Sequence, residues 1–177
     1  LGDVYKRQMP DRVTTDGLAV YAAGIAAAPV GEANLDNTPF LIFTVDSLSR
    51  RMDTDAFLPL FTEWEAVLEQ GLFLLPIDEN GLVYNDVQKP HSPYGFTDTI
   101  GKTGTLYMES LLYWRACRMM EHMCKTYGVG NPDHFAEAAE AVERSLSLLF
   151  DPAAGAFYAA TKDCHQYDIW GMAYMLY

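Results

Sequence analysis

Residues 103–128 read TGTLYMESLLYWRACRMMEHMCKTYG, the longest stretch of the chain with helical periodicity. Its apolar side chains recur three and four residues apart, which is typical of an α-helix. They form two adjacent stripes: Tyr113, Cys117, Met120 and Cys124 beside Leu112, Ala116, Met119 and Met123. Gly128 is expected to end this helix, because glycine is common directly after the last helical residue. We therefore predict a helix from Thr103 to Tyr127 that is buried on several sides.

Other segments alternate in character around this helix. Thr38 and Pro39 predict the start of a second broadly apolar helix that reaches Met52, with its first turns buried on several sides. Residues 55–70 and 132–150 instead show one apolar face each, with Glu65 off the first of these faces. A fifth helix is predicted to start near Asp168.

This alternation predicts inner helices surrounded by outer ones. The pattern repeats after about 65 residues, which indicates stacked helical hairpins. Periodicity alone leaves two architectures open, a closed barrel and an open helical solenoid. In either case the predicted class is all-α, with short β pieces in the loops.

Composition restricts the partners of the protein. The formal net charge of −12 is spread along the 177 residues, which argues against nucleic acid or an anionic membrane surface. The sequence has no apolar run of the roughly 20 residues that a membrane helix needs. Three cysteines form no disulfide framework and favour a reducing compartment such as the cytoplasm, but the sequence leaves the localisation open. Neutral ligands such as sugars remain open.

Both ends of the sequence bear on domain organisation. Residues 1–8, LGDVYKRQ, resemble a translated sequencing adapter, and we expect them to be a non-native leader. Residues 168–177 form an apolar run without a helix-stopping residue. We therefore expect residues 9–177 to be part of a catalytic domain that is truncated at both ends.

Three polar segments precede the apolar helices. They cover residues 34–37, 94–99 and 164–168, and each contains one aspartate, namely Asp36, Asp98 or Asp168. If the three helices are equivalent, these aspartates lie on one rim of the assembly. Carboxylates and amides beside aromatic rings suit a polyhydroxylated substrate. The competing interpretation is that each Asp is an ordinary helix cap.

Four stretches carry a resemblance to a known family. They are NLDNTPFLI at residues 34–42, PYGFTDTIGKTG at 93–104, FDPAAGAF at 150–157 and DIWGMAY at 168–174. In this order they resemble the bacterial six-hairpin glycosidases of the glycogen-debranching and rhamnosidase-like group. The resemblance covers about residues 34–177 and implies a partial (α/α)6 toroid and, commonly, inverting glycoside hydrolysis.

The resemblance also implies roles for particular residues. Inverting hydrolysis needs a carboxylic acid to protonate the leaving oxygen and a carboxylate to activate water. By resemblance the acid is Asp98, although Lys102 and a nearby helix N-terminus would favour its ionised form, which burial by Tyr94 and Phe96 would have to oppose. The base would come from a later hairpin outside this sequence. The residues expected to bind substrate are Asp36, Asn37, Tyr94, Phe96, Lys102, His165 and Asp168, and no metal or cofactor is expected.

Two rival functions are considered. A helical-repeat module would bind a protein on its concave surface, but the connection from Gly71 to Lys102 is longer than the turns of such repeats. A toroidal terpenoid cyclase would need acidic clusters for a metal-bound diphosphate or an aspartate-rich motif, and neither is evident. The sequence leaves the sugar, the linkage and the oligomeric state open.

Overall fold

Helices dominate the protein. The structure, a computed structural model, describes residues 10, 12–20, 23–25, 28–31, 34–92 and 101–176. The helices in this part are α1 (Asn37–Ser49), α2 (Thr54–Phe73), α3 (Tyr107–Tyr127), α4 (Pro132–Ser145) and α5 (Ile169–Met175), with a 3-10 turn at Leu146–Leu149. The strands are β1 (Arg12–Val13), β2 (Ala19–Val20), β3 (Ala23–Ile25), β4 (Ala28–Gly31), β5 (Tyr84–Asn85), β6 (Gly104–Thr105), β7 (Phe150–Asp151) and β8 (Ala156–Phe157).

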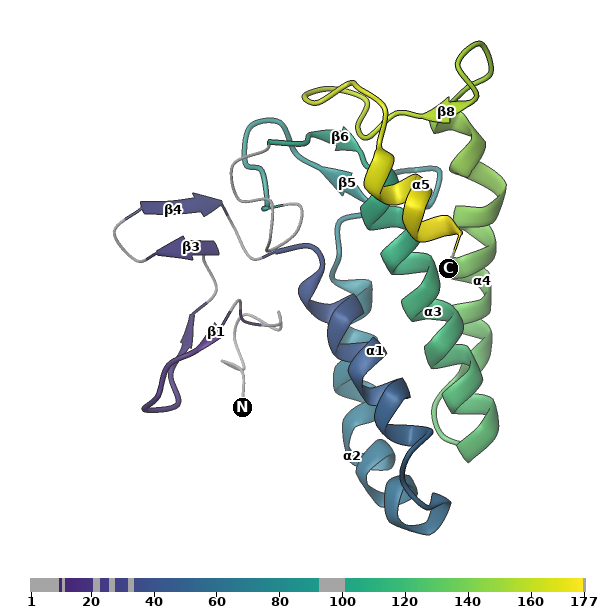
Figure 1. Ribbon diagram of the computed structural model, residues 1–177. Coiled ribbons are helices and arrows are strands. Elements are labelled where there is room, and N and C mark those ends of the chain that lie inside the picture. The colour runs from purple at the N-terminus through teal and green to yellow at the C-terminus, as the bar shows by residue number, and fades with distance from the viewer. Residues whose placement is uncertain are drawn as a thin grey trace.

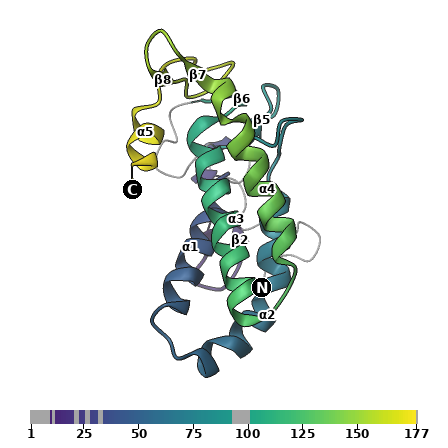
Figure 2. The same cartoon turned by 90° about the vertical axis from the view of Figure 1, so that its right-hand side faces the viewer.

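The central element is α3, which packs against α1, α2, α4 and α5. In Figure 1, α1, α3 and α5 all begin at the upper end of the bundle, and α2 and α4 run in the opposite direction. The strands β5 to β8 gather at that same end and form two antiparallel pairs, β5 with β6 and β7 with β8. Figure 2 shows α3 and α4 side by side from a second direction. The chain thus forms successive antiparallel helical hairpins.

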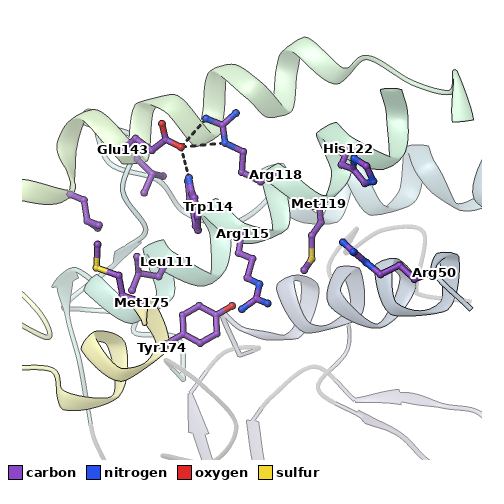
Figure 3. A pocket seen from close by; sticks show the side chains of 12 residues that line it. Arg50, Leu111, Trp114, Arg115, Arg118, Met119, His122, Glu143, Tyr174 and Met175 are labelled. Atoms are coloured by element: carbon purple, nitrogen blue, oxygen red, sulfur yellow. Dashed lines mark hydrogen bonds and ion pairs between the residues drawn. The ribbon is translucent and has the colours of Figure 1, made fainter. Parts of the chain in front are cut away.

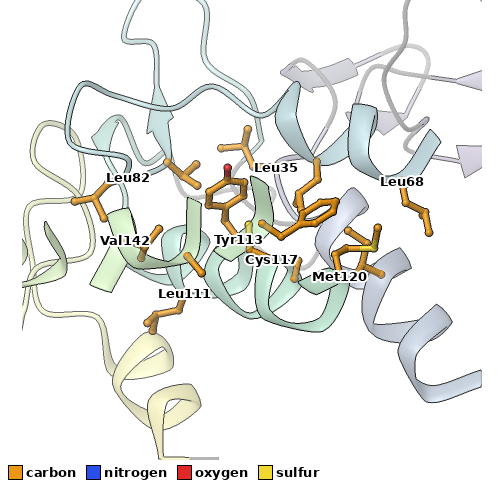
Figure 4. Packing of buried hydrophobic residues seen from close by; sticks show 14 of the residues in the cluster. Leu35, Leu68, Leu82, Leu111, Tyr113, Cys117, Met120 and Val142 are labelled. Carbon is orange, nitrogen blue, oxygen red and sulfur yellow. The ribbon is translucent and has the colours of Figure 1, made fainter. Parts of the chain in front are cut away.

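The core lies around α3. Both predicted stripes of this helix are confirmed, because seven of their eight residues are buried and Met119 packs against the core from its edge. Figure 4 shows Tyr113, Cys117 and Met120 of α3 between side chains from the neighbouring elements. Cys117 and Cys124 are free thiols in this core, as expected for small apolar residues. Twelve of the 21 residues of α3 are buried, against three of the 14 of α4, which supports the predicted inner and outer layers.

The difference between the layers is weaker for the first hairpin. Five of the 13 residues of α1 are buried, compared with six of the 20 of α2. At the start of α1, Thr38, Pro39 and Ile42 are buried but Phe40 is 40% exposed, so the first turns are buried on fewer sides than expected. Among the helices, α1 packs chiefly on α3 and, with fewer contacts, on α2.

Two helix starts differ from the sequence prediction. The N-cap of α1 is Asp36 and not Thr38, and Pro39 falls at the third helical position, where its missing N–H costs no helical hydrogen bond. α3 begins four residues later than predicted. Gly104 and Thr105 form β6 and pair with β5, while the Thr103 hydroxyl donates to Asp163 Oδ2 at 2.6 Å. Thr103 therefore joins two loops and does not start the helix.

The amphipathic helices agree more closely with the prediction. Asn131 caps α4 by accepting a hydrogen bond from the N–H of Asp133, and Phe135, Ala139 and Val142 form its buried face. In α2, the apolar face is confirmed, but the placement of Glu65 outside it is wrong. Glu65 is buried, and its carboxyl group lies against Gly130, where an added Cβ atom would come within 2.1 Å of Oε1.

In the part of the chain that the structure describes, no helix combines the length and the apolar character needed to cross a lipid bilayer.

Candidate functional site

Four charged side chains from distant parts of the sequence are buried together where α1, α3 and α5 begin. They are Asp36, Lys102, Glu109 and Asp168, exposed by 5%, 3%, 2% and 4%. We call them the polar cluster. Asp36 and Asp168 are the N-caps of α1 and α5, Glu109 lies in the first turn of α3, and Lys102 precedes β6. The common direction of the three helices brings these positions to one end.

Lys102 connects the cluster. Its Nζ atom lies 3.3 Å from Oδ2 of Asp168 and 3.7 Å from Oε1 of Glu109. One ammonium group is therefore shared by two buried carboxyl groups, and Asp36 adds a third that repels Glu109 electrostatically. With all four groups ionised the cluster would carry a net charge of −2, which is costly away from water.

Glu109 relieves part of that cost by binding its proton more tightly than an ordinary carboxyl group does. Burial raises its pKa from the ordinary 4.5 to about 7; Lys102 and a backbone hydrogen bond oppose this rise, while Asp168 and Asp36 add to it. Ionised carboxylates are stabilised at a helix N-terminus, and the first turn of α3 should therefore lower this pKa. Desolvation outweighs that effect because Glu109 is almost completely buried.

Asp168 holds the start of α5 as well as Lys102. Its Oδ1 atom accepts a hydrogen bond of 2.9 Å from the N–H of Gly171. Gly171 in turn lies close to the ring of Tyr107. A Cβ atom added at this position would be only 2.5 Å from Tyr107 Cδ1. Tyr107 is itself stacked on Phe157, with ring centroids 4.4 Å apart. Burial, with a contribution from Asp168, raises the pKa of Tyr107 to about 12, so its hydroxyl is neutral.

The predicted acid and two of the predicted aromatic residues, Asp98, Tyr94 and Phe96, lie outside the described residues. The two flanks of their segment are described, and Asn85 joins them. Its Nδ2 atom donates to the carbonyl oxygens of His91, at 2.9 Å, and Lys102, at 2.7 Å, while its Oδ1 accepts from His91 N at 2.8 Å. Asn85 is fully buried. This side chain therefore fixes both ends of the segment that carries Asp98.

The structure brings together only some of the predicted site residues. Asp36, Lys102 and Asp168 meet in the polar cluster. Asn37 instead donates to the carbonyl oxygen of Pro10 at 3.2 Å. His165 is exposed, its Nδ1 atom lies 2.9 Å from the carbonyl oxygen of Ala160, and its ring stacks on Tyr158. These two residues make their observed contacts outside the cluster.

Sequence reasoning missed two residues of the site, Glu109 and Asn85. A signal for Glu109 was present, because it lies three and four residues before Leu112 and Tyr113 and so belongs to the buried stripes of α3. A carboxyl group within a buried stripe is costly unless it is paired or protonated. Asn85 gave no comparable signal, because its role depends on contacts with residues 91 and 102 that only the fold creates.

A second candidate surface is a groove of about 610 Å³ along α3, α4 and the end of α5, drawn in Figure 3. Glu143 accepts hydrogen bonds there from Trp114, at 2.7 Å, and Arg118, at 2.8 Å. Arg115 lies over the ring of Tyr174, 5.3 Å from its centroid. These contacts hold Glu143 and Arg118 as an ion pair. The groove contains none of the predicted site residues. We therefore take the polar cluster as the candidate active site.

Comparison of the chain with protein-family models, with curated proteins and with solved structures finds no match. Among the described residues, no group of three or more His, Cys, Asp or Glu side chains is arranged to hold a metal ion. The candidate site is thus defined by its geometry and electrostatics alone.

Proposed function

We propose that the chain is part of a glycoside hydrolase of the six-hairpin type that acts on an oligo- or polysaccharide. The observation that carries the proposal is the polar cluster. Three residues chosen from separate sequence segments, Asp36, Lys102 and Asp168, meet at the end where the apolar helices begin. A shared position was expected only if these helices are equivalent members of consecutive hairpins.

The arrangement of the helices supports the architectural part of the proposal. α1, α3 and α5 run in one direction, α2 and α4 return in the other, and the better buried helix of the α3–α4 pair is α3. Inner and outer helices of a partial (α/α)6 toroid have this relation. Loops that connect an outer helix to the next inner helix then all reach one end, and those loops contain Lys102 and Asp168.

The chemistry of the cluster suits a sugar and the charge that develops during its hydrolysis. Carboxylates accept hydrogen bonds from neighbouring hydroxyl groups, and an ammonium group donates to ring or hydroxyl oxygens. The net negative charge that Asp36 and Asp168 leave beside a single lysine stabilises a positively charged, oxocarbenium-like transition state. In this proposal Asp98 donates the proton to the leaving oxygen, and a carboxylate from a later hairpin activates water.

Enzyme assays with the protein encoded by the complete gene test the proposal. Release of reducing sugar from a panel of oligo- and polysaccharides should identify a substrate. Asp168→Asn and Lys102→Met should then lower kcat/KM, whereas Glu137→Gln, an exposed change on α4, should leave it unchanged. A correctly folded protein that hydrolyses no member of the panel, or equal kcat/KM values for all four proteins, would contradict the proposal.

The helical-repeat interaction module is the alternative. Its functional surface would be a helix face and not the polar cluster. The connection between α2 and α3 argues against it, because residues 74–106 contain a two-stranded pair, the buried Asn85 and the buried Lys102. Connections within helical repeats are short and lack such buried polar groups.

A further inference from the structure

Glu109 is the least satisfied charged residue of the polar cluster. Neither of its buried carboxyl oxygens has a hydrogen-bond partner of ordinary geometry, and only a contact with its own backbone N–H favours the ionised form from within the helix. Its closest charged contact is the ion pair of Oε1 with Lys102 Nζ at 3.7 Å. A buried carboxyl group without hydrogen bonds weakens a fold. Buried carboxyl groups with a raised pKa and a specific charge partner are frequent in functional sites.

Lys102 links Glu109 to the start of α5. The ammonium group that contacts Glu109 also donates to Asp168 Oδ2 at 3.3 Å, and Asp168 Oδ1 accepts from the N–H of Gly171 at 2.9 Å. Gly171 lies so close to the ring of Tyr107 on α3 that no Cβ atom would fit between them. The path from Glu109 through Lys102 and Asp168 to Gly171 thus consists of contacts between groups that are buried.

We propose that Glu109 is a positioning residue of the candidate site: the charge on its carboxyl group determines how Lys102 is shared between Glu109 and Asp168, and so how firmly Asp168 is held. The proposal rests on the proposed function only in assigning Asp168 to a sugar-binding site. The contacts themselves do not depend on the substrate.

The direction of the effect follows from electrostatics. When Glu109 is neutral, Lys102 interacts chiefly with Asp168, and both the carboxylate and the α5 cap are fixed. When Glu109 is ionised, it competes for the same ammonium group, and the hold on Asp168 weakens. The charged or titratable groups that face Glu109 are Asp36 from the start of α1, Lys102 from the loop before β6 and Asp168 from the start of α5. Because burial raises the pKa of Glu109 to about 7, the change falls near neutral pH.

The test follows the Gly171 amide by NMR, through its chemical shift and its hydrogen exchange, from about pH 5 to about pH 9. In the wild-type protein the Gly171 signal should titrate with a midpoint near the Glu109 pKa of about 7, and exchange should speed up above it beyond the ordinary effect of base. Glu109→Gln keeps the shape of the neutral carboxyl group but cannot ionise, so this titration should disappear. The control Glu137→Gln should retain it.

A second variant keeps the test decisive if Glu109→Gln does not fold. Asp168→Asn preserves the helix cap, since Asn and Asp cap equally well, but it removes the charge that Lys102 binds. The titration at Gly171 should then lose most of its amplitude. An unchanged Gly171 titration in either variant, or no titration in the wild-type protein, overturns the proposal.

Enzyme kinetics separate this proposal from the proposed function. On a substrate found in the panel, the wild-type kcat/KM should fall as pH rises through the range in which Glu109 ionises, and Glu109→Gln should remove that limb of the profile. If no glycoside is hydrolysed but the Gly171 titration depends on Glu109, the glycosidase proposal fails and the positioning role stands. If hydrolysis occurs and its pH profile is the same in Glu109→Gln, the positioning role fails.

Discussion

Replacing Glu109 by glutamine should change the pH dependence of folding stability. The pKa of Glu109 is raised in the folded protein, from 4.5 to about 7. The folded state therefore binds this proton more tightly than the unfolded state does. The stability that this proton contributes is complete below the unfolded pKa and is lost as pH rises through about 7.

The size of the effect follows from the shift itself. The difference between about 7 and 4.5 is about 2.5 pKa units. Each unit corresponds to about 1.4 kcal/mol, so the wild-type protein should lose about 3 kcal/mol of unfolding free energy between about pH 4 and about pH 9 through this group. Glutamine has no proton to lose. The stability of Glu109→Gln relative to wild type should therefore increase by the same amount over that range.

Urea unfolding at a series of pH values measures this difference. Comparing each variant with wild type at the same pH removes the contributions of the other titrating groups. The exposed Glu137→Gln should follow the wild-type curve at every pH. Our reasoning is refuted if the curves of wild type and Glu109→Gln stay parallel, since Glu109 would then have an ordinary pKa in the folded protein.

Three further predictions concern the site. Asp98→Asn should reduce kcat on unactivated sugars by about 10² to 10⁴-fold, and less on activated aryl glycosides, as steady-state kinetics will show. Asn85→Ala should cost at least about 2 kcal/mol in urea unfolding because it removes the three hydrogen bonds that this fully buried side chain makes with His91 and Lys102, whereas a change at the exposed Asn80 should cost little. Gly171→Ala should lower the melting temperature despite the better helix propensity of alanine, because its Cβ meets the Tyr107 ring; Gly101→Ala, which has open space, should not.

The sequence predicted helices best where local signals decide them. α4 has a capping Asn131, a proline at its first position and one apolar face, and each of these features acts within a few residues. The start of α3 was misplaced because pairing of Gly104 and Thr105 with Tyr84 and Asn85 overrides the local pattern. Such pairing depends on residues about twenty positions away, which helical periodicity does not reveal.

The site was predictable to the extent that helix direction determines it. Asp36 and Asp168 precede apolar helices, and the structure places both at the end where these helices begin. The side-chain contacts were not predictable in the same way. Asn37 and His165 sit in the same segments as these two aspartates but direct their hydrogen bonds to the carbonyl oxygens of Pro10 and Ala160. A segment can thus be placed from its pattern, while the direction of each side chain depends on tertiary packing.

One aspartate can be both a helix cap and a residue of the candidate site. Asp168 caps α5 with Oδ1 and binds Lys102 with Oδ2, so the helix fixes the orientation of a carboxyl group whose second oxygen faces the polar cluster. Asn at this position would preserve the cap, because Asn and Asp cap equally well, but it would leave Lys102 without this charge partner. Stability and activity should therefore respond differently to Asp168→Asn. A small loss of stability with a large loss of activity would separate the role of the second oxygen from that of the first.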